Sequence, residues 1–363
     1  MAVLQDRLTG IRSNVSLAPY TTIGLGGSAK YFISCPTVDE ICSAIEFGRS
    51  ENLPIVVLGG GSNIIFPDEG FEGLVIKIDY KGIHFEDDGS RTVARVNAGE
   101  GWDDFVKLCV EKDLAGVECL SGIPGSVGAT PIQNVGAYGQ EVRDTIVSVK
   151  AINIESLKVV ELNSGRCEFG YRNSRFKTRD KNKFVIVEAG YKLMNAGGPT
   201  VKYDELREYI ELRRKRTGNG KQETEELSLN TVREAVLALR KKKSMIIDRD
   251  DPNSKSVGSF FVNPILSEVE YKNFKERLVS AGIKRAPSYR DTNGIKISAA
   301  WLVENSGFQK GYKRNGVGIS SNHSLALVNY SGTAREILSL ASDIENAVFE
   351  KFGVKLQKEA VIV

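Results

Sequence analysis

Short apolar runs separated by glycine turns dominate the first half of the chain. We expect strands in six of these runs: KYFIS, IVVLGGG, LVIKI, TVARVNAG, IVSVKAINI and FVIVEAGYKL. Two segments between them, Val38–Ser50 and Trp102–Val110, instead repeat apolar residues with the spacing of an amphipathic helix. The mixture predicts an α+β fold rather than an all-β sandwich.

The pattern changes after about residue 200, where longer helical segments alternate with charged connections. Ser267 with Glu270, and Thr333 with Glu336, match the S/T-x-x-E capping box that opens a helix. The last helix is expected to end before Gly353. Residues 212–227 are almost entirely polar, with basic residues followed by acidic ones. We expect a mobile loop there, with a lid over an anionic ligand as the alternative.

Composition narrows the classes of function. The 363 residues include 49 Lys and Arg against 46 Asp and Glu, a net charge of +3. So small an excess provides no overall field for nucleic acid or a membrane surface, and any anion must be bound locally. We therefore expect neither nucleic acid nor a membrane as partner, and a monomer.

The cysteines and histidines indicate neither disulfides nor a metal site. The five cysteines have no CxxC spacing and mostly fall in apolar segments, as ordinary buried thiols do: Cys35, Cys42, Cys109, Cys119 and Cys167. With only two histidines, a zinc site is improbable. The first residues lack the pattern of a signal peptide, and no apolar run reaches the roughly 18 residues that a membrane span needs. The sequence predicts a cytoplasmic protein.

Glycine-rich segments supply the candidate ligand sites. GLGGSA, residues 24–29, fits the dinucleotide fingerprint formally, but a strand follows it where that motif requires a helix, so we reject this interpretation. VLGGGSN, residues 57–63, follows an apolar run. Its three glycines let backbone N–H groups converge on an anion, and Ser62 and Asn63 add hydrogen-bonding side chains. A plain tight turn is the alternative.

A second glycine-rich segment, SGIPGSVGATPIQNVGAYG, spans residues 121–139. Pro124 and Pro131 disfavour a helix and the glycines permit close approach, so we expect an irregular wrap. Few charges and several polar side chains suit a large, flat, mostly neutral ligand with a polar edge. Together the two loops suggest one ligand, with a pyrophosphate on the first loop and rings against the second.

One hydroxyl stands in an apolar, tightly turned setting in VGSFFVNP, residues 257–264. Ser259 lies between Gly258 and two phenylalanines, a setting that raises the question of a chemical role for the hydroxyl. The alternative is a hydroxyl that only bonds backbone in a Gly-Ser turn. A nucleophilic serine is disfavoured, because nothing resembles G-x-S-x-G.

Six segments, in this order, carry a resemblance over nearly the whole chain: TIGLGGSAKYF, VLGGGSN, SGIPGSVGATPIQNVGAYG, FGYRNS, GSFFVNP and AAWLVENSGF. The chain resembles the UDP-N-acetylenolpyruvoylglucosamine reductase family, also called UDP-N-acetylmuramate dehydrogenases, in the subclass with a substrate-closing tyrosine loop. The resemblance implies an FAD-binding fold of the vanillyl-alcohol oxidase type, made of two α+β subdomains, plus a C-terminal α/β substrate-binding domain. We expect the subdomains at residues 1–76 and 77–200, and the substrate-binding domain, with the tyrosine loop and the polar insert 212–227, at 201–363.

The resemblance also implies an activity. NADPH reduces noncovalently bound FAD, which reduces UDP-N-acetylglucosamine enolpyruvate to UDP-N-acetylmuramate. This oxidoreductase step belongs to peptidoglycan precursor synthesis, and so to cell wall biogenesis, cell shape and cell division. Two alternatives stay open: another FAD-dependent oxidase or dehydrogenase of the same fold that acts on a hydroxy acid or sugar lactone, and a nonenzymatic UDP-sugar sensor.

The family's catalytic residues transfer to three positions. Ser259 is the proton donor, Arg172 in GYRNS binds the substrate carboxylate and the developing enolate, and Glu359 in LQKEAVIV works with both. A glutamate beside developing negative charge must be protonated or share a hydrogen bond, and burial would raise its pKa in that direction. Only a short segment follows Glu359, so its anchoring is open.

The remaining site residues also follow from the resemblance. Expected FAD contacts are Gly59, Gly60, Gly61, Ser62, Asn63, Gly122, Ile123, Pro124, Ile132, Gln133, Asn134, Gly136, Ala137 and Tyr138. Expected substrate contacts are Tyr171, Arg172, Tyr203, Lys243 and Asn263, with Lys241 and Lys242 as alternatives to Lys243. Ala129 replaces a hydroxyl residue of some relatives, which puts one flavin contact in doubt. We expect His323 as a possible pocket residue, His84 as an exposed strand residue, and no metal.

Overall fold

The computed structural model describes residues 10–217 and 227–363, which form two compact units. Each unit combines segments from separate parts of the chain. Unit 1 holds the described residues up to Val15, Ala29–Gly60 and Glu72–Ile246, and unit 2 holds Ser16–Ser28, Gly61–Phe71 and Ile247–Val363. The chain therefore crosses between the units several times, once within the first glycine loop.

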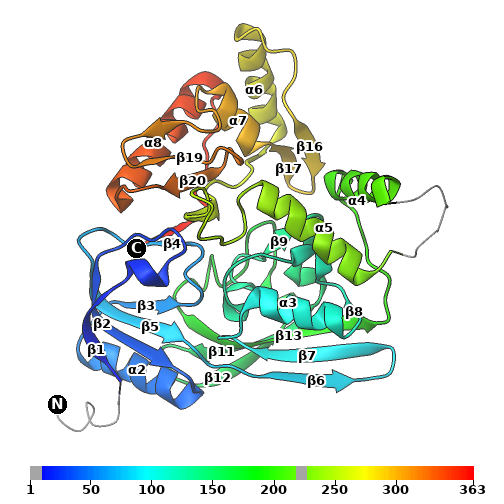
Figure 1. Cartoon of the computed structure of the whole chain (residues 1–363). Helices are drawn as coiled ribbons and strands as arrows, with labels where there is room; N and C mark the ends of the chain where they lie inside the picture. Colours follow the sequence, from blue (N-terminus) through cyan, green and yellow to red (C-terminus); the bar gives the residue numbers. More distant parts are fainter. Residues whose placement is uncertain (1–9, 218–226) are drawn as a thin grey trace. The chain divides into compact units, whose positions relative to one another are not determined.

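Two sheets make the framework of unit 1 (Figure 1). The first has the order β1-β2-β5-β3: β1 (Arg12–Ser16), β2 (Ser28–Cys35), β5 (Phe71–Ile78) and β3 (Ile55–Leu58). The second has the order β12-β11-β13-β7-β6, with β8 also paired to β13: β12 (Val159–Asn163), β11 (Ile146–Asn153), β13 (Phe184–Asn195), β7 (Arg91–Asn97), β6 (Ile83–Asp87) and β8 (Leu114–Ala115). β3 and β5 run parallel, whereas the strands of the second sheet pair antiparallel.

Strand β13 shows why the second sheet is buried on both faces. Successive side chains of a strand point to opposite faces, and Val185 and Val187 pack into the core that includes α2 (Val38–Ser50). Ile186 belongs to the other core, which includes α3 (Trp102–Glu111). Tyr191 joins that core as well, because the register with β11 shifts between Ile186 and Glu188 and the alternation changes there. Unit 1 therefore has cores on both sides of one central sheet.

Shorter elements carry the ligand loops of unit 1. They are η2 (Glu118–Leu120), η3 (Val127–Ala129), β9 (Gly136–Ala137), β10 (Gln140–Glu141), η4 (Val142–Asp144) and η5 (Ser164–Cys167), followed by α4 (Asp204–Thr217) and α5 (Leu229–Lys242). The apolar face of α5, with Val232 and Val236, packs against Leu206 and Ile210 of α4. This small core fixes the start of α4, where Tyr203 lies.

Unit 2 has its own helices, sheets and core. One sheet has the order β14-β20-β19-β18 and another β15-β17-β16, and β21 pairs with β4 in parallel. The elements are η1 (Ala18–Tyr20), β4 (Ile64–Ile65), β14 (Ser256–Ser259), β15 (Ile265–Leu266), α6 (Glu268–Ser280), β16 (Ser288–Asp291), β17 (Gly294–Ile297), α7 (Ala299–Asn305), β18 (Lys313–Arg314), β19 (Val317–Ile319), β20 (Ala326–Asn329), α8 (Ala334–Phe352) and β21 (Val361–Ile362).

The expected helix signals are confirmed. α2 covers Val38–Ser50, and α3 begins at Trp102 as expected. Both capping boxes form, because Ser267 and Thr333 accept hydrogen bonds from the N–H groups three residues on. α8 ends before Gly353, whose φ of 69° is the left-handed conformation of a helix C-cap.

Two expectations about organisation differ from the structure. Residues 201–246 belong to unit 1, not to the C-terminal part, because α4 and α5 pack on the core that contains Cys119. Residues 212–217 are not a loop but the last part of α4. The rest of the predicted mobile insert, residues 218–226, lies outside the described residues. A run of charged residues suits the exposed faces of a helix as well as a loop, which is why sequence reasoning erred.

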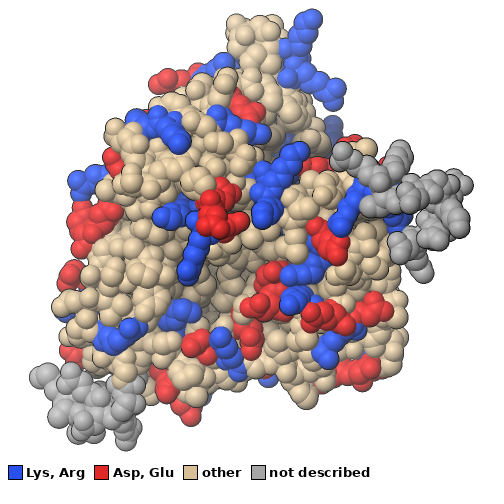
Figure 2. All heavy atoms as spheres, in the orientation of Figure 1, with Lys and Arg blue, Asp and Glu red and all other residues tan. Residues whose placement is uncertain are grey.

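The thiols and charges agree with the sequence analysis. The cysteines are free thiols, all buried except the half-buried Cys42, and burial raises the pKa of Cys35 to about 12. Basic and acidic side chains are interspersed on the face shown in Figure 2. Among the described residues, no helix is both long and apolar enough to cross a membrane.

Candidate active site

The first glycine loop, residues 59–63, follows β3 and meets the second loop at backbone distance. A Cβ on Gly60 would lie 2.6 Å from the Cα of Gly125 and 2.9 Å from its carbonyl carbon. Only glycine, which lacks a Cβ, allows two backbones to approach this closely. The two loops therefore meet within unit 1, and a single ligand can reach both.

Backbone amides of the first loop are available to a ligand. Among the described residues, no acceptor is found for the N–H groups of Gly60 and Gly61. Unpaired amides in a glycine turn attract an anion such as a phosphate. The loop therefore has N–H groups that can bind an anion, as its three glycines predict.

The second loop is an irregular wrap with short 3-10 turns, as expected, and an ion pair between a half-buried aspartate and a buried arginine anchors its start. The carboxylate of Asp103, on α3, accepts the N–H of Gly122 at 2.6 Å and both terminal nitrogens of Arg233, on α5, at 2.6 and 2.9 Å. Burial opposes ionisation of Asp103, but these hydrogen bonds outweigh it and lower the pKa. The loop is thereby tied to two helices.

A second buried arginine beside this loop has an unsatisfied donor. Arg240 is 8% exposed, and its Nε has no hydrogen-bond partner among the described residues. Its Nη2 donates to the carbonyl of Met245 at 2.7 Å, and its side chain lies against Gly122. Burial lowers its pKa. A buried polar group without a partner is rare and calls for an explanation, and a ligand that presents acceptors to this loop provides one.

The side chain of Asn134 makes hydrogen bonds to protein groups. It is fully buried, its amide donates to Glu141 Oε2 and to the carbonyl of Gly170, both at 2.8 Å, and its oxygen accepts from the N–H of Arg143 at 3.1 Å. All of these partners are protein groups. The side chain joins the second loop to the segment that carries Arg172, so its expected contact with FAD would have to come from its backbone.

Arg172 is held in an unusual backbone conformation. Its φ is 49°, and Asn134 and Tyr138 also have positive φ values, of 47° and 49°. Such conformations cost of order 1–3 kcal/mol each and persist only where the surroundings enforce them. The guanidinium donates to the carbonyls of Gly136 at 2.5 Å and Asn134 at 3.5 Å. The second loop therefore holds the side chain of the arginine, whereas its backbone carbonyl accepts a hydrogen bond from Lys177 Nζ at 3.1 Å.

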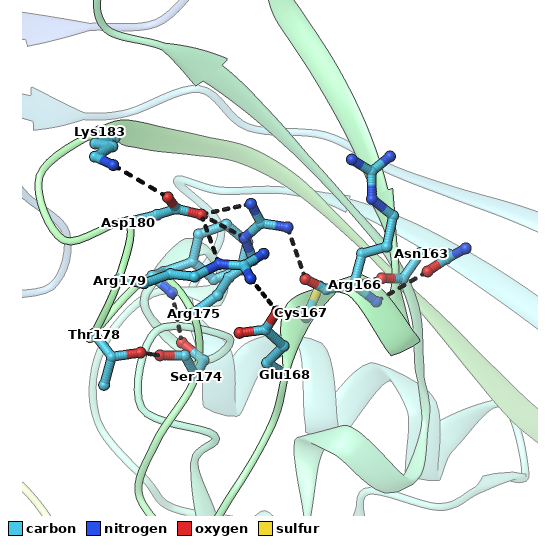
Figure 3. A network of polar contacts seen from close by, with 11 residues as sticks. Asn163, Arg166, Cys167, Glu168, Ser174, Arg175, Thr178, Arg179, Asp180 and Lys183 are labelled. Carbon is cyan, nitrogen blue, oxygen red and sulfur yellow. Dashed lines mark hydrogen bonds and ion pairs between the residues drawn. The ribbon is translucent and has the colours of Figure 1, made fainter.

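A polar network anchors the chain just beyond Arg172 (Figure 3). Arg175 contacts Asp180 Oδ2 with Nε at 2.7 Å and with Nη2 at 2.5 Å, and its Nη1 donates to the carbonyl of Arg166 at 2.9 Å. Thr178 donates to the carbonyl of Ser174 at 2.8 Å. The Ser174 hydroxyl in turn donates to the carbonyl of Ile132, in the second loop, at 2.6 Å. This network fixes the turn that presents Arg172.

In unit 2, the structure brings Ser259 and Glu359 onto adjacent backbone segments. Ser259, half-buried, ends β14 and is followed by two buried phenylalanines, Phe260 and Phe261. The N–H of Glu359 donates to the carbonyl of Phe260 at 2.8 Å. The hydroxyl setting predicted from the sequence is therefore present, beside the expected glutamate.

The anchoring of Glu359, left open by the sequence, comes from the first glycine loop. Asn63 Nδ2 donates to the carbonyl of Glu359 at 3.1 Å, and the Asn63 carbonyl accepts the N–H of Val361 at 3.0 Å. β21 then pairs with β4. Asn63 is expected as an FAD contact, but its side-chain amide also donates a hydrogen bond that positions Glu359.

Three of the expected nucleotide and cofactor residues cluster in unit 1. The rings of Tyr138 and Tyr203 meet edge to face with centroids 5.7 Å apart, and Lys243 Nζ lies 5.8 Å from the Tyr138 ring centroid. Lys243 is half-buried, whereas Lys241 and Lys242 are exposed. The cluster favours Lys243 among the three lysines. Burial, the largest influence, raises the pKa of Tyr138 to about 12.

The other predicted residues have varied surroundings. Asn263 Oδ1 accepts the N–H of Ala299 at 2.8 Å and so holds the start of α7. His323 Nδ1 accepts the N–H of Leu325 at 3.1 Å, in the turn that leads to the partner strand of β14. His84 is exposed on β6, as expected. Pro124, Gln133, Ala137 and Tyr171 are half-buried, Ile123 packs on the unit 1 core, and Ile132 is exposed.

Comparisons with known proteins agree with this arrangement. A family model described as FAD binding domain matches residues 29–163, and one described as UDP-N-acetylenolpyruvoylglucosamine reductase, C-terminal domain, matches residues 250–363. UDP-N-acetylenolpyruvoylglucosamine reductase of Thermobifida fusca is 42% identical over 98% of both chains. That of Streptomyces coelicolor is 41% identical over 96% of this chain and 88% of its own.

The chain belongs to the UDP-N-acetylenolpyruvoylglucosamine reductase family. The crystal structure of a reductase of this name from Thermus caldophilus has the same fold, with a TM-score of 0.63 at 23% identity over 97% of this chain and 99% of the other. The expected fold, an FAD-binding domain of two α+β parts with a C-terminal reductase domain, is confirmed. The tight loop contact at Gly60 and the unsatisfied donor of Arg240 both fit a bound FAD.

Sequence reasoning missed the charged residues that support the loops: Asp103, Arg233 and Arg240. A signal was present, because Arg233 and Arg240 are seven residues apart and share the apolar face of α5 with Val236 and Leu239. Charged residues at core positions of a helix are rare unless they are paired or functional. Their partners, more than a hundred residues away for Asp103, could not be read from that spacing.

Replacing Arg240 tests two effects separately: its effect on the stability of the fold and its contribution to FAD affinity. We expect Arg240→Met to leave the thermal stability of the flavin-free protein equal or higher, because burial opposes the charge of Arg240, nearby Asp103 offsets this only in part, and Nε lacks a hydrogen-bond partner among the described residues. FAD affinity should fall roughly ten- to hundred-fold, as for loss of a hydrogen bond from a charged group. Thermal melts and fluorescence titration with FAD measure both. Lys242→Met, an exposed change on the same helix, is the control, and a less stable protein with unchanged FAD affinity would contradict this role.

Replacing Asp180 tests the network behind Arg172. Arg175 and Asp180 are 11% and 12% exposed, so Asp180→Asn leaves a largely buried guanidinium and should lower the free energy of unfolding by about 3 kcal/mol at pH 7. Burial opposes ionisation of Asp180, but the bonds from Arg175 and Lys183 lower its pKa.

The contribution of Asp180 is therefore complete above the ordinary carboxyl pKa of about 3.9 and disappears as the pH falls through the lowered value. Urea unfolding at several pH values should show the difference between wild type and Asp180→Asn shrinking below about pH 4. Asp204→Asn, at an 82% exposed side chain, is the control with little effect. A difference that stays constant into acid would refute the ion-pair explanation.

Proposed function

We propose that the protein reduces the enolpyruvyl group of UDP-N-acetylenolpyruvoylglucosamine to the lactyl group of UDP-N-acetylmuramate, with NADPH as reductant, in peptidoglycan precursor synthesis in the cytoplasm. The observation that carries this proposal is the similarity to reductases of this activity along nearly the whole chain. Bound FAD would take electrons from NADPH and supply hydride to the substrate. The two glycine loops would hold it.

Ser259 is the proposed proton donor. Hydride addition to the outer carbon of an enol ether leaves negative charge on the carbon beside the carboxylate, and that carbon must be protonated. A serine hydroxyl is a weak acid, but a carbanion-like centre is a strong enough base to take its proton. The half-buried position of Ser259, followed by buried phenylalanines, supports this role because it limits access of water.

Arg172 is the proposed ligand of the substrate carboxylate. A guanidinium can donate two parallel hydrogen bonds to a carboxylate and stabilises charge that spreads onto it as an enolate. Glu359 assists only if it is protonated or shares a hydrogen bond, since a second negative charge would oppose the reaction. The backbone carbonyls of both residues accept side-chain hydrogen bonds, from Lys177 and from Asn63, and this supports their roles because each side chain starts from a held position.

Tyr203, Lys243 and Asn263 are the proposed contacts to the nucleotide, with Tyr171 beside Arg172. An ammonium is a compact charge for a diphosphate, and a tyrosine ring covers a base or sugar at small entropic cost. The edge-to-face contact of Tyr203 with Tyr138 supports its assignment to the subclass whose tyrosine closes over the substrate.

Rapid mixing of the two half-reactions tests the proposal. The wild-type flavoprotein should be bleached by NADPH and recoloured by the enolpyruvyl nucleotide. Ser259→Ala should leave bleaching nearly unchanged and slow recolouring by roughly 10²–10⁴-fold, because only the second step needs the proton. Ser280→Ala, on the exposed end of α6, is the matched control.

Three outcomes would count against the proposal. A wild-type protein that NADPH bleaches but the enolpyruvyl nucleotide does not recolour would refute the activity. Equal slowing of both steps in Ser259→Ala would refute the proton-donor role alone. Flavin that stays attached after denaturation would favour an oxidase that tethers its cofactor covalently.

A further inference from the structure

The ammonium of Lys243, the proposed contact for the substrate diphosphate, is already paired with an anion of the protein. Lys243 Nζ lies 2.6 Å from Glu205 Oε2. Glu205 stands in the first turn of α4, two residues after Tyr203. The lysine caps the C-terminal end of α5, and its ammonium also lies near the ring of Tyr138. One cluster thus joins both tyrosines, the lysine and an acidic residue.

This ion pair is weak enough to be exchanged. The Lys243 and Glu205 side chains are 30% and 41% exposed, so water screens their attraction. By contrast, Arg233 of the Asp103 pair is only 10% exposed and binds through two nitrogens. A diphosphate carries more negative charge than a carboxylate and presents several acceptor oxygens to the same ammonium. The two acids are similarly exposed, at 36% for Asp103 and 41% for Glu205, so the pairs differ in the burial of the cation and in the number of its contacts. The Lys243 pair is the weaker of the two.

Glu205 and Tyr203 also belong to one hydrogen-bonded turn. The carbonyl of Tyr203 accepts the N–H groups of Leu206 and Arg207, both at 3.1 Å, so Tyr203 belongs to the hydrogen-bonded start of α4. Glu205 lies inside that turn. While it is bound to Lys243, the pair holds the start of α4 beside α5, with Tyr203 against Tyr138. Release of the pair would loosen the turn that carries the tyrosine.

We propose that Glu205 is an internal competitor for the ammonium of Lys243, which a nucleoside diphosphate must displace, and that it thereby sets the affinity for the nucleotide. The inference rests on the proposed function, since it assigns the diphosphate to Lys243. Glu205 is an affinity-determining residue that acts through the lysine. Its negative charge also repels a ligand phosphate that approaches the cluster.

Calorimetric titration with UDP tests the proposal on the flavin-loaded protein. Glu205→Gln should bind UDP roughly two- to five-fold more tightly than wild type at low ionic strength, the range for release of a half-exposed ion pair. The gain should shrink at 0.5 M salt, chosen as roughly three times physiological ionic strength, because salt screens exposed charges. Glu208→Gln, an exposed glutamate one turn later on α4, makes the same change in net charge and should leave the affinity near wild type.

Lysine variants separate failure of this inference from failure of the proposed function. Lys243→Met should weaken UDP binding at least roughly ten-fold, and Glu205→Gln added to it should give no further gain. If Lys243→Met binds UDP like wild type, or if wild type does not bind UDP, the proposed nucleotide contact itself is wrong. If Lys243→Met weakens binding and Glu205→Gln also weakens it, Glu205 orients the lysine. If Glu205→Gln instead binds UDP like Glu208→Gln, Glu205 does not affect the affinity. Either result refutes the proposal that Glu205 competes with the nucleotide.

Discussion

The site in unit 1 depends on one close approach of two backbones, at Gly60 and Gly125. Because a Cβ at residue 60 would overlap backbone atoms that cannot rotate away, the loops can meet only if that residue is glycine. The rest of the site is arranged around this contact. Asp103 ties the start of the second loop to two helices, Asn134 ties its middle to the Arg172 segment, and the loop's own carbonyls hold the guanidinium of Arg172.

The polar groups of the site therefore divide into those that support the loops and those left for ligands. The side chain of Asn134 is committed to protein partners, and Asn63 gives a donor to the backbone of Glu359. In contrast, the Nε of Arg240 lacks a partner among the described residues. Buried polar groups usually have partners, and this donor lies against Gly122 of the second loop, so we expect a bound molecule there. The side chains that position the loops, Asn134 and Asn63, are thus different from Arg240 on α5, which keeps a donor for a ligand.

Much of this organisation could be predicted from the sequence, because its signals are local. Apolar spacing gave α2 and α3, capping boxes gave the starts of α6 and α8, and glycine spacing gave both loops. The boundary expected at residue 200 differs from the division into compact units, because whether α4 and α5 pack with the earlier or the later part depends on contacts far apart in sequence. The partners of Asp103 and Lys243 were missed for the same reason, since a charge does not reveal from its own position which opposite charge it meets.

The most direct test of the central claim is the flavin content of Gly60→Ala, compared with Gly198→Ala. Gly60 lacks a positive φ, so alanine can adopt its backbone conformation and only the overlap with Gly125 opposes it. Gly198 has open space where a Cβ would stand. We predict that Gly60→Ala folds, by circular dichroism, but is purified with little or no FAD, whereas Gly198→Ala retains the wild-type ratio of flavin to protein. A Gly60→Ala protein with a full complement of tightly bound FAD would contradict the account.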